Sequence, residues 1–131
     1  MNKITENMIR EAYKALPNAY APYSLFKVAS CICTDKDNLY TGVNVENSSY
    51  SLTACAESSA ICNMVLGGEQ RIKSIVVVAD NRLLCSPCGA CRQRIHEFST
   101  PDTMVHLCNE HVVFQSLTID KLLPLAFDLN P

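Results

Sequence analysis

The sequence predicts a three-layer α/β/α sandwich built on a mixed sheet of roughly five strands. Segments with apolar residues at helical spacing alternate with short apolar or β-branched segments, in the expected order α-β-β-α-β-α-β-β-α. Helices that alternate with apolar strands cover both faces of a sheet. The 131 residues also suffice for one apolar core without disulfide staples. We therefore expect one domain over residues 1–131.

The first expected elements are a helix and a hairpin. Apolar residues recur at helical spacing over residues 5–16, and Pro17 ends that helix. Residues 26–34 are rich in small, apolar and β-branched side chains, and residues 39–45 form a second such segment. The polar residues 35–38 turn the chain between them, so the two segments are expected to pair as strands.

The middle of the chain predicts a helix and a buried strand. Thr53 is suited to cap a helix that runs to about Leu66, where Gly67-Gly68 stops it. Residues 75–79 form a continuous run of Ile, Val and Ala, which is typical of a strand covered on both faces.

The last third predicts two helices and two short strands. Ser86-Pro87 is a capping residue followed by proline, which favours a helix that starts there and runs to about Phe98. Residues 104–108 and 112–114 are expected as strands, and residues 117–123 as a last short helix.

Composition and charge argue against several classes of partner. The 11 Lys and Arg residues are scattered and the formal net charge is −2, so nucleic acid is not an expected ligand. No apolar run approaches the roughly 18 residues of a membrane span. Residues 1–10 are charged and lack the apolar segment of a signal peptide, so we expect a cytoplasmic protein.

The eight cysteines are many for this length. In a secreted chain an even number would indicate disulfides, but thiols stay reduced in the cytosol, where clustered cysteines more often bind a metal. Two short motifs open two expected helices: Thr-Ala-Cys-Ala-Glu at 53–57 and Pro-Cys-Gly-Ala-Cys at 87–91. Helix amino termini favour anions, and so favour the thiolates that zinc requires.

The spacing of these motifs predicts a catalytic zinc site. Cys88 and Cys91 are three residues apart and share one face of a helix, and Cys55 would be a third ligand. Three protein ligands leave one position open, which is the catalytic pattern, whereas structural zinc usually has four. Glu57 lies two residues from a proposed ligand and is suited to move protons beside the metal without binding it.

Other cysteines and the histidines have simpler interpretations. Cys85 and Cys88 also form a C-x-x-C pair, and a bound Cys85 would make the site closed and structural. Because Cys85 precedes the proline, we expect it to remain a free thiol beside the site. The remaining cysteines are expected as packing residues, and none of the histidines is spaced to replace a ligand: Cys31, Cys33, Cys62, Cys108, His96, His106 and His111.

Together the motifs resemble the small, homotetrameric, zinc-dependent cytidine deaminases. The resemblance covers nearly the whole chain, with the motifs in the family's order. They are Tyr-Ser-Leu-Phe-Lys-Val at 23–28, Asn-Val-Glu-Asn at 44–47, Cys-Ala-Glu at 55–57, Pro-Cys-Gly-Ala-Cys-Arg-Gln at 87–93 and Leu-Leu-Pro-Leu-Ala-Phe at 122–127.

This resemblance implies hydrolytic deamination of free cytidine or deoxycytidine in pyrimidine salvage, with one zinc per subunit of a homotetramer. Zinc hydroxide would attack C4 of the base while Glu57 shuttles protons. Phe26 would pack on the base, Asn44 and Glu46 would bind the sugar, Ala56 would offer a backbone group, and Phe127 would complete a neighbouring subunit's pocket.

The residues leave simpler alternatives open for most of these contacts. Asn44 and Glu46 are also suited to capping their own loop, and Phe26 and Phe127 to ordinary core packing. For the whole chain, one alternative is a deaminase of a related amino-pyrimidine nucleoside, such as a nucleoside antibiotic. The other is a non-catalytic zinc-stabilised module, which would have no need of Glu57.

One position departs from the family pattern. The family commonly has Arg directly after the catalytic Glu, where this chain has Ser58. Three thiolates on Zn²⁺ carry a net charge of about −1, which such an Arg would offset. We hypothesise that helix amides and Arg92 compensate here, and that the metal-bound water is less acidic than in relatives.

Overall fold

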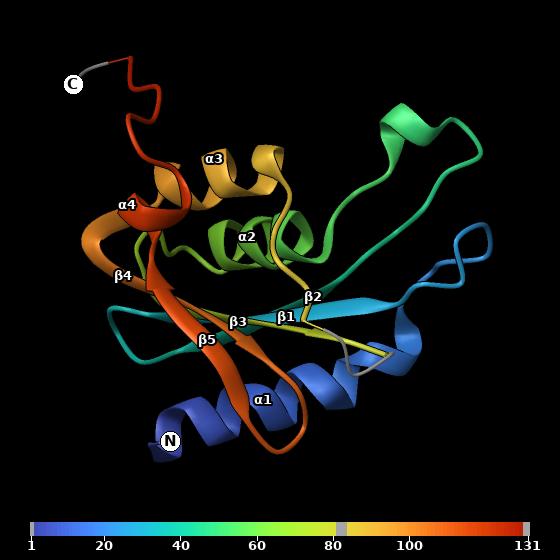
Figure 1. Ribbon diagram of the computed structural model, residues 1–131, viewed down its shortest axis with the longest axis horizontal. Helices are drawn as coiled ribbons and strands as arrows, with labels where there is room; N and C mark the ends of the chain where they lie inside the picture. The colour runs from blue at the N-terminus through green and yellow to red at the C-terminus, as the bar shows by residue number, and fades with distance from the viewer. Residues whose placement is uncertain (1, 81–83, 130–131) are drawn as a thin grey trace.

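The computed structural model describes residues 2–80 and 84–129 and has three layers. A five-stranded sheet lies in the middle, with helix α1 on one face and helices α2 and α3 on the other (Figure 1). The expected α/β/α sandwich with a mixed sheet is therefore confirmed. Within the described ranges, no helix is long and apolar enough to cross a membrane.

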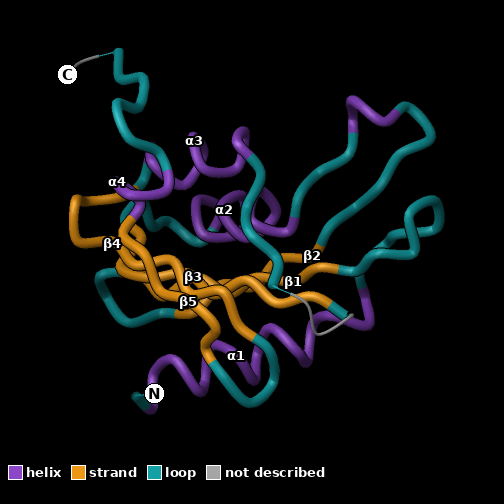
Figure 2. Tube along the Cα trace, viewed as in Figure 1, coloured by secondary structure: helices purple, strands orange, loops and turns teal. Residues whose placement is uncertain are grey.

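The helices and strands alternate as the sequence predicts, and Figure 2 colours them by type. The helices are α1 (Lys3–Ala15), α2 (Ala56–Leu66), α3 (Gly89–Glu97) and α4 (Ile119–Leu122). The strands are β1 (Val28–Thr34), β2 (Leu39–Val43), β3 (Ile72–Ala79), β4 (Ser99–Cys108) and β5 (Val113–Thr118). Two 3-10 turns lie at Leu16–Asn18 and Tyr50–Leu52.

The sheet has the strand order β2-β1-β3-β4-β5, and only β3 and β4 are parallel. A parallel pair needs a crossover connection, which α3 supplies between these two strands. Helices α2 and α3 lie side by side above the sheet, and both begin at the same end, toward the right in Figure 1. This arrangement brings their amino termini together.

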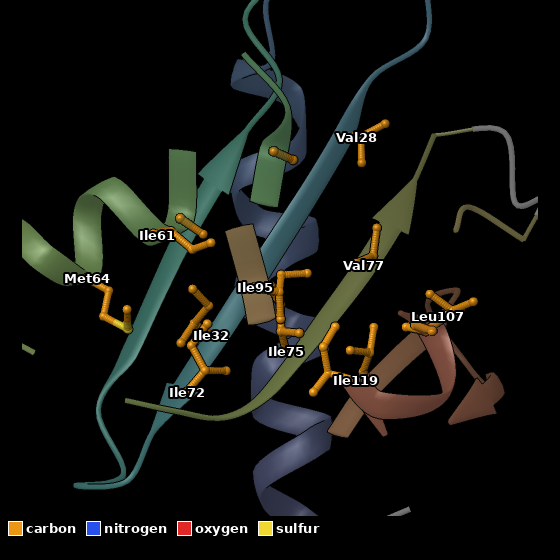
Figure 3. Close-up of a cluster of buried hydrophobic side chains, with 14 of the residues drawn as sticks. Val28, Ile32, Ile61, Met64, Ile72, Ile75, Val77, Ile95, Leu107 and Ile119 are labelled. Carbon is orange, nitrogen blue, oxygen red and sulfur yellow. The ribbon is translucent and has the colours of Figure 1, made fainter. Parts of the chain in front are cut away.

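The core is divided between the two faces of the sheet. Along β3, Ile75 and Val77 face α2 and α3, whereas Val76 and Val78 face α1. Figure 3 shows the first set packed with Ile32 and Met64. The continuous Ile/Val run is therefore covered on both faces, as predicted, because each face of the strand meets a separate helix layer.

Both helices of the upper layer start later than the sequence suggested. The N-cap of α2 is Cys55 and not Thr53, whose hydroxyl instead accepts a hydrogen bond from the backbone N–H of Asn47 at 3.3 Å. The N-cap of α3 is Cys88 and not Ser86. The Cys88 sulfur accepts from the backbone N–H of Cys91 at 3.4 Å and so takes the capping role.

Several strand boundaries also differ from the expected ones. The strands β3 and β4 begin earlier than residues 75 and 104, because parallel pairing already joins Ile72 to Ser99. Strand β5 continues to Thr118, so the last helix starts at Ile119. Pairing with a neighbouring strand extended these segments beyond what local propensity indicates.

Helix α2 lies directly on β2 because Gly42 has no side chain. A Cβ at Gly42 would lie 2.2 Å from the backbone nitrogen of Ala60 and 2.5 Å from the carbonyl oxygen of Ala56. We expect Gly42→Ala to lower the free energy of unfolding by about 3 kcal/mol, measured by urea titration. Gly89→Ala is the matched control, since nothing lies within 4 Å of its Cβ, and equal stabilities of the two variants would contradict the prediction.

Candidate active site

Three cysteine sulfurs meet where α2 and α3 begin. Cys55 occupies the N-cap position of α2, Cys88 that of α3, and Cys91 lies in the first turn of α3. All three sulfurs lie within 4.8 Å of one another, and those of Cys55 and Cys88 are 3.8 Å apart. Tetrahedral zinc with Zn–S bonds of about 2.3 Å separates its sulfurs by about 3.8 Å. This donor set therefore fits zinc and leaves a fourth position free of protein ligands from the described residues.

The three thiols differ in their readiness to ionise without a metal. Burial raises the pKa of Cys88, but hydrogen bonds from the Cys91 and Ala90 amides and from the neighbouring thiols outweigh it, so the net pKa is lowered. Burial raises the pKa of Cys55. Burial, together with the charge of Glu57, also raises the pKa of Cys91. A bound divalent cation would hold all three as thiolates.

Glu57 lies beside this cluster in the first turn of α2. Only 4 % of the residue is exposed, and burial is the main reason why the pKa of its carboxyl is raised. Its own backbone amide and the charge of Arg94 act in the opposite direction. A buried carboxyl that exchanges its proton more readily near neutral pH is suited to general acid–base work.

Cys85 lies close to the cluster but outside it. Among the described residues, the group with metal-binding geometry contains only Cys55, Cys88 and Cys91. Cys85 packs against the core under α2 and α3, and burial, with the charges of Glu57 and Cys55, raises its pKa to about 11. It therefore remains a protonated thiol at neutral pH.

The two arginines of α3 have different partners. Arg92 donates to the carbonyl oxygens of Pro87 and Leu122, at 2.9 and 2.8 Å, and to the Ser86 hydroxyl at 2.9 Å. Among the described residues, none of these partners is a sulfur, so compensation of the thiolates by Arg92 would act through its charge without direct contact and stays a hypothesis. Sequence reasoning missed Arg94, whose Nη1 lies 3.7 Å from the sulfur of Cys91. The available signal was its spacing, three residues after a ligand on the same helix.

Asn44 and Glu46 make local contacts in the loop after β2. The Asn44 amide accepts from the backbone N–H of Val28 at 2.9 Å and donates to the carbonyl of Phe26 at 2.8 Å. The Glu46 carboxylate accepts from the backbone N–H groups of Tyr23 and Ser24, at 3.0 and 3.1 Å, and from the Ser24 hydroxyl. The Ser24 hydroxyl is the main reason why the pKa of Glu46 is lowered. Both side chains thus brace the segment that carries Phe26.

The other three candidates for substrate contact have different settings. Phe26 is partly buried against the core under α2. Ala56 is the buried first residue of α2, and its carbonyl accepts from the Ser30 hydroxyl at 3.2 Å. Phe127 is 70 % exposed in the C-terminal tail, which rises beyond α3 in Figure 2, and its carbonyl accepts from Gln93 at 3.0 Å. Phe127 is therefore no part of this chain's own core.

Comparison with known proteins gives a consistent result. Residues 2–107 match the model of the cytidine and deoxycytidylate deaminase zinc-binding region. A cytidine deaminase of Sporosarcina psychrophila is 43 % identical over 122 residues, which cover 93 % of this chain and 90 % of the relative. One of Halalkalibacterium halodurans is 41 % identical over 126 residues, covering 94 % and 96 %.

A solved structure is also similar. The crystal structure of cytidine deaminase from Burkholderia pseudomallei superposes with a TM-score of 0.87 at 36 % sequence identity, covering 97 % of this chain and all of that one. The three-sulfur cluster with its buried carboxyl thus lies in a chain whose sequence and fold both match deaminases. The protein belongs to the cytidine and deoxycytidylate deaminase family with a zinc-binding region.

Proposed function

We propose that this chain catalyses the hydrolytic deamination of cytidine or deoxycytidine, giving uridine or deoxyuridine and ammonia, with one Zn²⁺ per subunit. The observation that carries the proposal is the buried carboxyl of Glu57 beside a group of three sulfurs that could hold a metal ion. A purely structural zinc site would need a fourth ligand and no such carboxyl. The relatives at 41–43 % identity are themselves named cytidine deaminases.

The three cysteines and Glu57 have separate roles in the proposed reaction. Zinc, when held by Cys55, Cys88 and Cys91, supplies the Lewis acidity that makes a water molecule nucleophilic near neutral pH. Glu57 accepts a proton from the attacking water and delivers it to N3 of the base as the new C–O bond forms at C4. Glu57 then carries the remaining proton of that hydroxyl to the leaving amine as the C4–N bond breaks, so that ammonia departs.

Substrate recognition is proposed for the loop that Asn44 and Glu46 brace. Phe26 would pack on the base, the amide of Ala56 would orient it, and Asn44 and Glu46 would bind the sugar hydroxyls. The hydrogen bonds of Asn44 to the backbone at Phe26 and Val28 support this arrangement, because they hold Asn44 beside the segment that carries the aromatic ring. A free nucleoside is small enough for such a site, and the net charge of −2 favours no polyanion.

Assembly is proposed to complete the pocket. The chain, as a single domain over residues 1–131, would form a homotetramer in the cytoplasm and act in pyrimidine salvage. The C-terminal tail leaves Leu125, Phe127 and Leu129 exposed, and the loop before α2 exposes Tyr50 and Leu52. Large apolar side chains exposed in these two segments support contact with another chain. Phe127 would thereby enter a neighbouring subunit's site.

The direct test combines a zinc analysis with an ultraviolet assay of cytidine consumption. We expect one zinc per chain and a fall in absorbance as cytidine becomes uridine, with ammonia released in equal amount. A protein that holds zinc but leaves cytidine and deoxycytidine unchanged would contradict the proposal.

Phe127→Ala is expected to lower kcat/KM for cytidine by about 10-fold, because a buried aromatic contact contributes strongly to an interface. Leu129→Ala on the same exposed tail is the matched control and should retain activity. Subunits of Phe127→Ala mixed with those of Glu57→Gln should regain activity, since each supplies what the other lacks. Mixtures no more active than the sum of their parts would contradict a shared pocket.

A further inference from the structure

The guanidinium group of Arg94 points at the sulfur cluster. Its Nη1 lies 3.7 Å from the sulfur of Cys91, one helical turn earlier on α3. Within residues 2–80 and 84–129, this sulfur is the one hydrogen-bond acceptor that the Arg94 side chain reaches. Cys91 itself is fully buried, whereas Arg94 is an exposed residue.

A nearby cation would stabilise the negative charge of the metal-bound site. Three thiolates on Zn²⁺ carry a net charge of about −1, and the Glu57 carboxylate adds to it when ionised. Arg92 is already engaged by two carbonyls and a hydroxyl. Ser58, one turn after Cys55, brings no charge.

We propose that Arg94 is the positioning residue that offsets the negative charge of the zinc–thiolate centre, in place of an arginine at position 58. The inference assumes the zinc site of the proposed function but not its substrate. Three thiolates on one Zn²⁺ leave the metal-bound centre with a net negative charge, and the Arg94 guanidinium lies 3.7 Å from one of the three sulfurs. A fixed positive charge therefore favours the metal-bound state over the metal-free one.

The test measures zinc affinity by competition with a chromophoric chelator at pH 7, without substrate. We expect Arg94→Gln to bind zinc about 10-fold more weakly than the parent, which is the usual range for a residue that contacts a metal ligand. Arg94→Lys should keep most of the affinity because it keeps the charge. Arg10→Gln is the matched control, since Arg10 is exposed on α1 across the sheet and donates a hydrogen bond to Asn7 on its own helix.

A second variant separates charge from local structure. Ser58→Arg, added to Arg94→Gln, returns a cation one turn after Cys55 and is expected to restore the zinc affinity. Thermal unfolding of the zinc-free proteins checks that Arg94→Gln folds as the parent does. Unchanged affinity in Arg94→Gln, or an equal loss in Arg94→Lys, would overturn the inference. Because no nucleoside is present, failure of the proposed deamination would leave these affinities unaffected.

Discussion

Glu57→Gln is expected to bind one zinc per chain and to lose cytidine turnover by about 10,000-fold. Glutamine has nearly the same shape, but its amide neither accepts nor releases a proton near neutral pH, and general acid–base catalysis contributes up to about that factor. Zinc should remain because the three sulfurs are unchanged. Zinc analysis together with the fall in ultraviolet absorbance of cytidine measures both quantities on one sample.

The stability of this variant gives an independent check on the buried carboxyl. Burial raises the pKa of Glu57 in the folded, zinc-free chain, so ionisation destabilises the folded state as the pH rises above the pKa of the unfolded chain. Zinc-free Glu57→Gln should then be at least as stable as the parent at pH 7, by urea titration. A large loss of stability would instead indicate that the carboxylate has an essential partner.

Glu97→Gln is the matched control for charge and helix position. Glu97 is exposed at the last residue of α3, away from the sulfur cluster, so its change should leave both zinc and turnover as they were. If Glu57→Gln kept more than a tenth of the parent's turnover, the proton-transfer role would be wrong. Zinc loss in Glu57→Gln would make Glu57 a part of the metal site itself.

The sulfur cluster could be predicted from the sequence because its information is local. A C-x-x-C at a helix start places two sulfurs on one face, whatever the rest of the fold does. Cys55 was predicted as the third ligand from the Cys-Ala-Glu motif that opens another helix, but the parallel arrangement of α2 and α3 that brings its sulfur to the other two was not predicted. The sulfur of Cys88 also took over the cap that Ser86 was expected to provide, an outcome that propensity rules for capping residues do not include.

The charge partner could not be chosen from the sequence. Arg92 and Arg94 differ by two residues, which on a helix turns their side chains about 200° apart. Which neighbours each arginine side chain contacts depends on the segments that pack beside α3. Arg92 meets the carbonyl of Leu122 at the end of α4, a long-range contact that no local pattern encodes. Arg94 is left to contact the sulfur of Cys91.

The loop contacts show a similar limit. Asn44 and Glu46 have side chains that suit either sugar hydroxyls or backbone amides, and the sequence alone does not choose between them. In the folded chain both bind the backbone just before β1 and at its first residue: Glu46 at Tyr23 and Ser24, and Asn44 at Phe26 and Val28. These partners are about 20 residues distant and become neighbours only because β1 and β2 pair in register.

Replacing Cys91 with Ala is expected to reduce zinc from one per chain to a trace, and cytidine turnover to the background rate. Two sulfurs hold zinc far less tightly than three, and Cys91 is the fully buried member of the cluster. Adding a chelator to the parent should have the same effect on turnover, and zinc should reverse it. Metal analysis and the ultraviolet assay measure both results.

Cys85→Ala is the decisive control for this experiment. Like Cys91, Cys85 is a cysteine near Glu57. It is half-buried and lies outside the group of three sulfurs. The variant should therefore keep its zinc and its turnover. Loss of zinc in Cys85→Ala would mean that a fourth thiolate closes the metal's coordination, as in structural sites, and water would then have no position from which to be activated. A site that tolerates Cys85→Ala and fails with Cys91→Ala has the open coordination that hydrolysis requires.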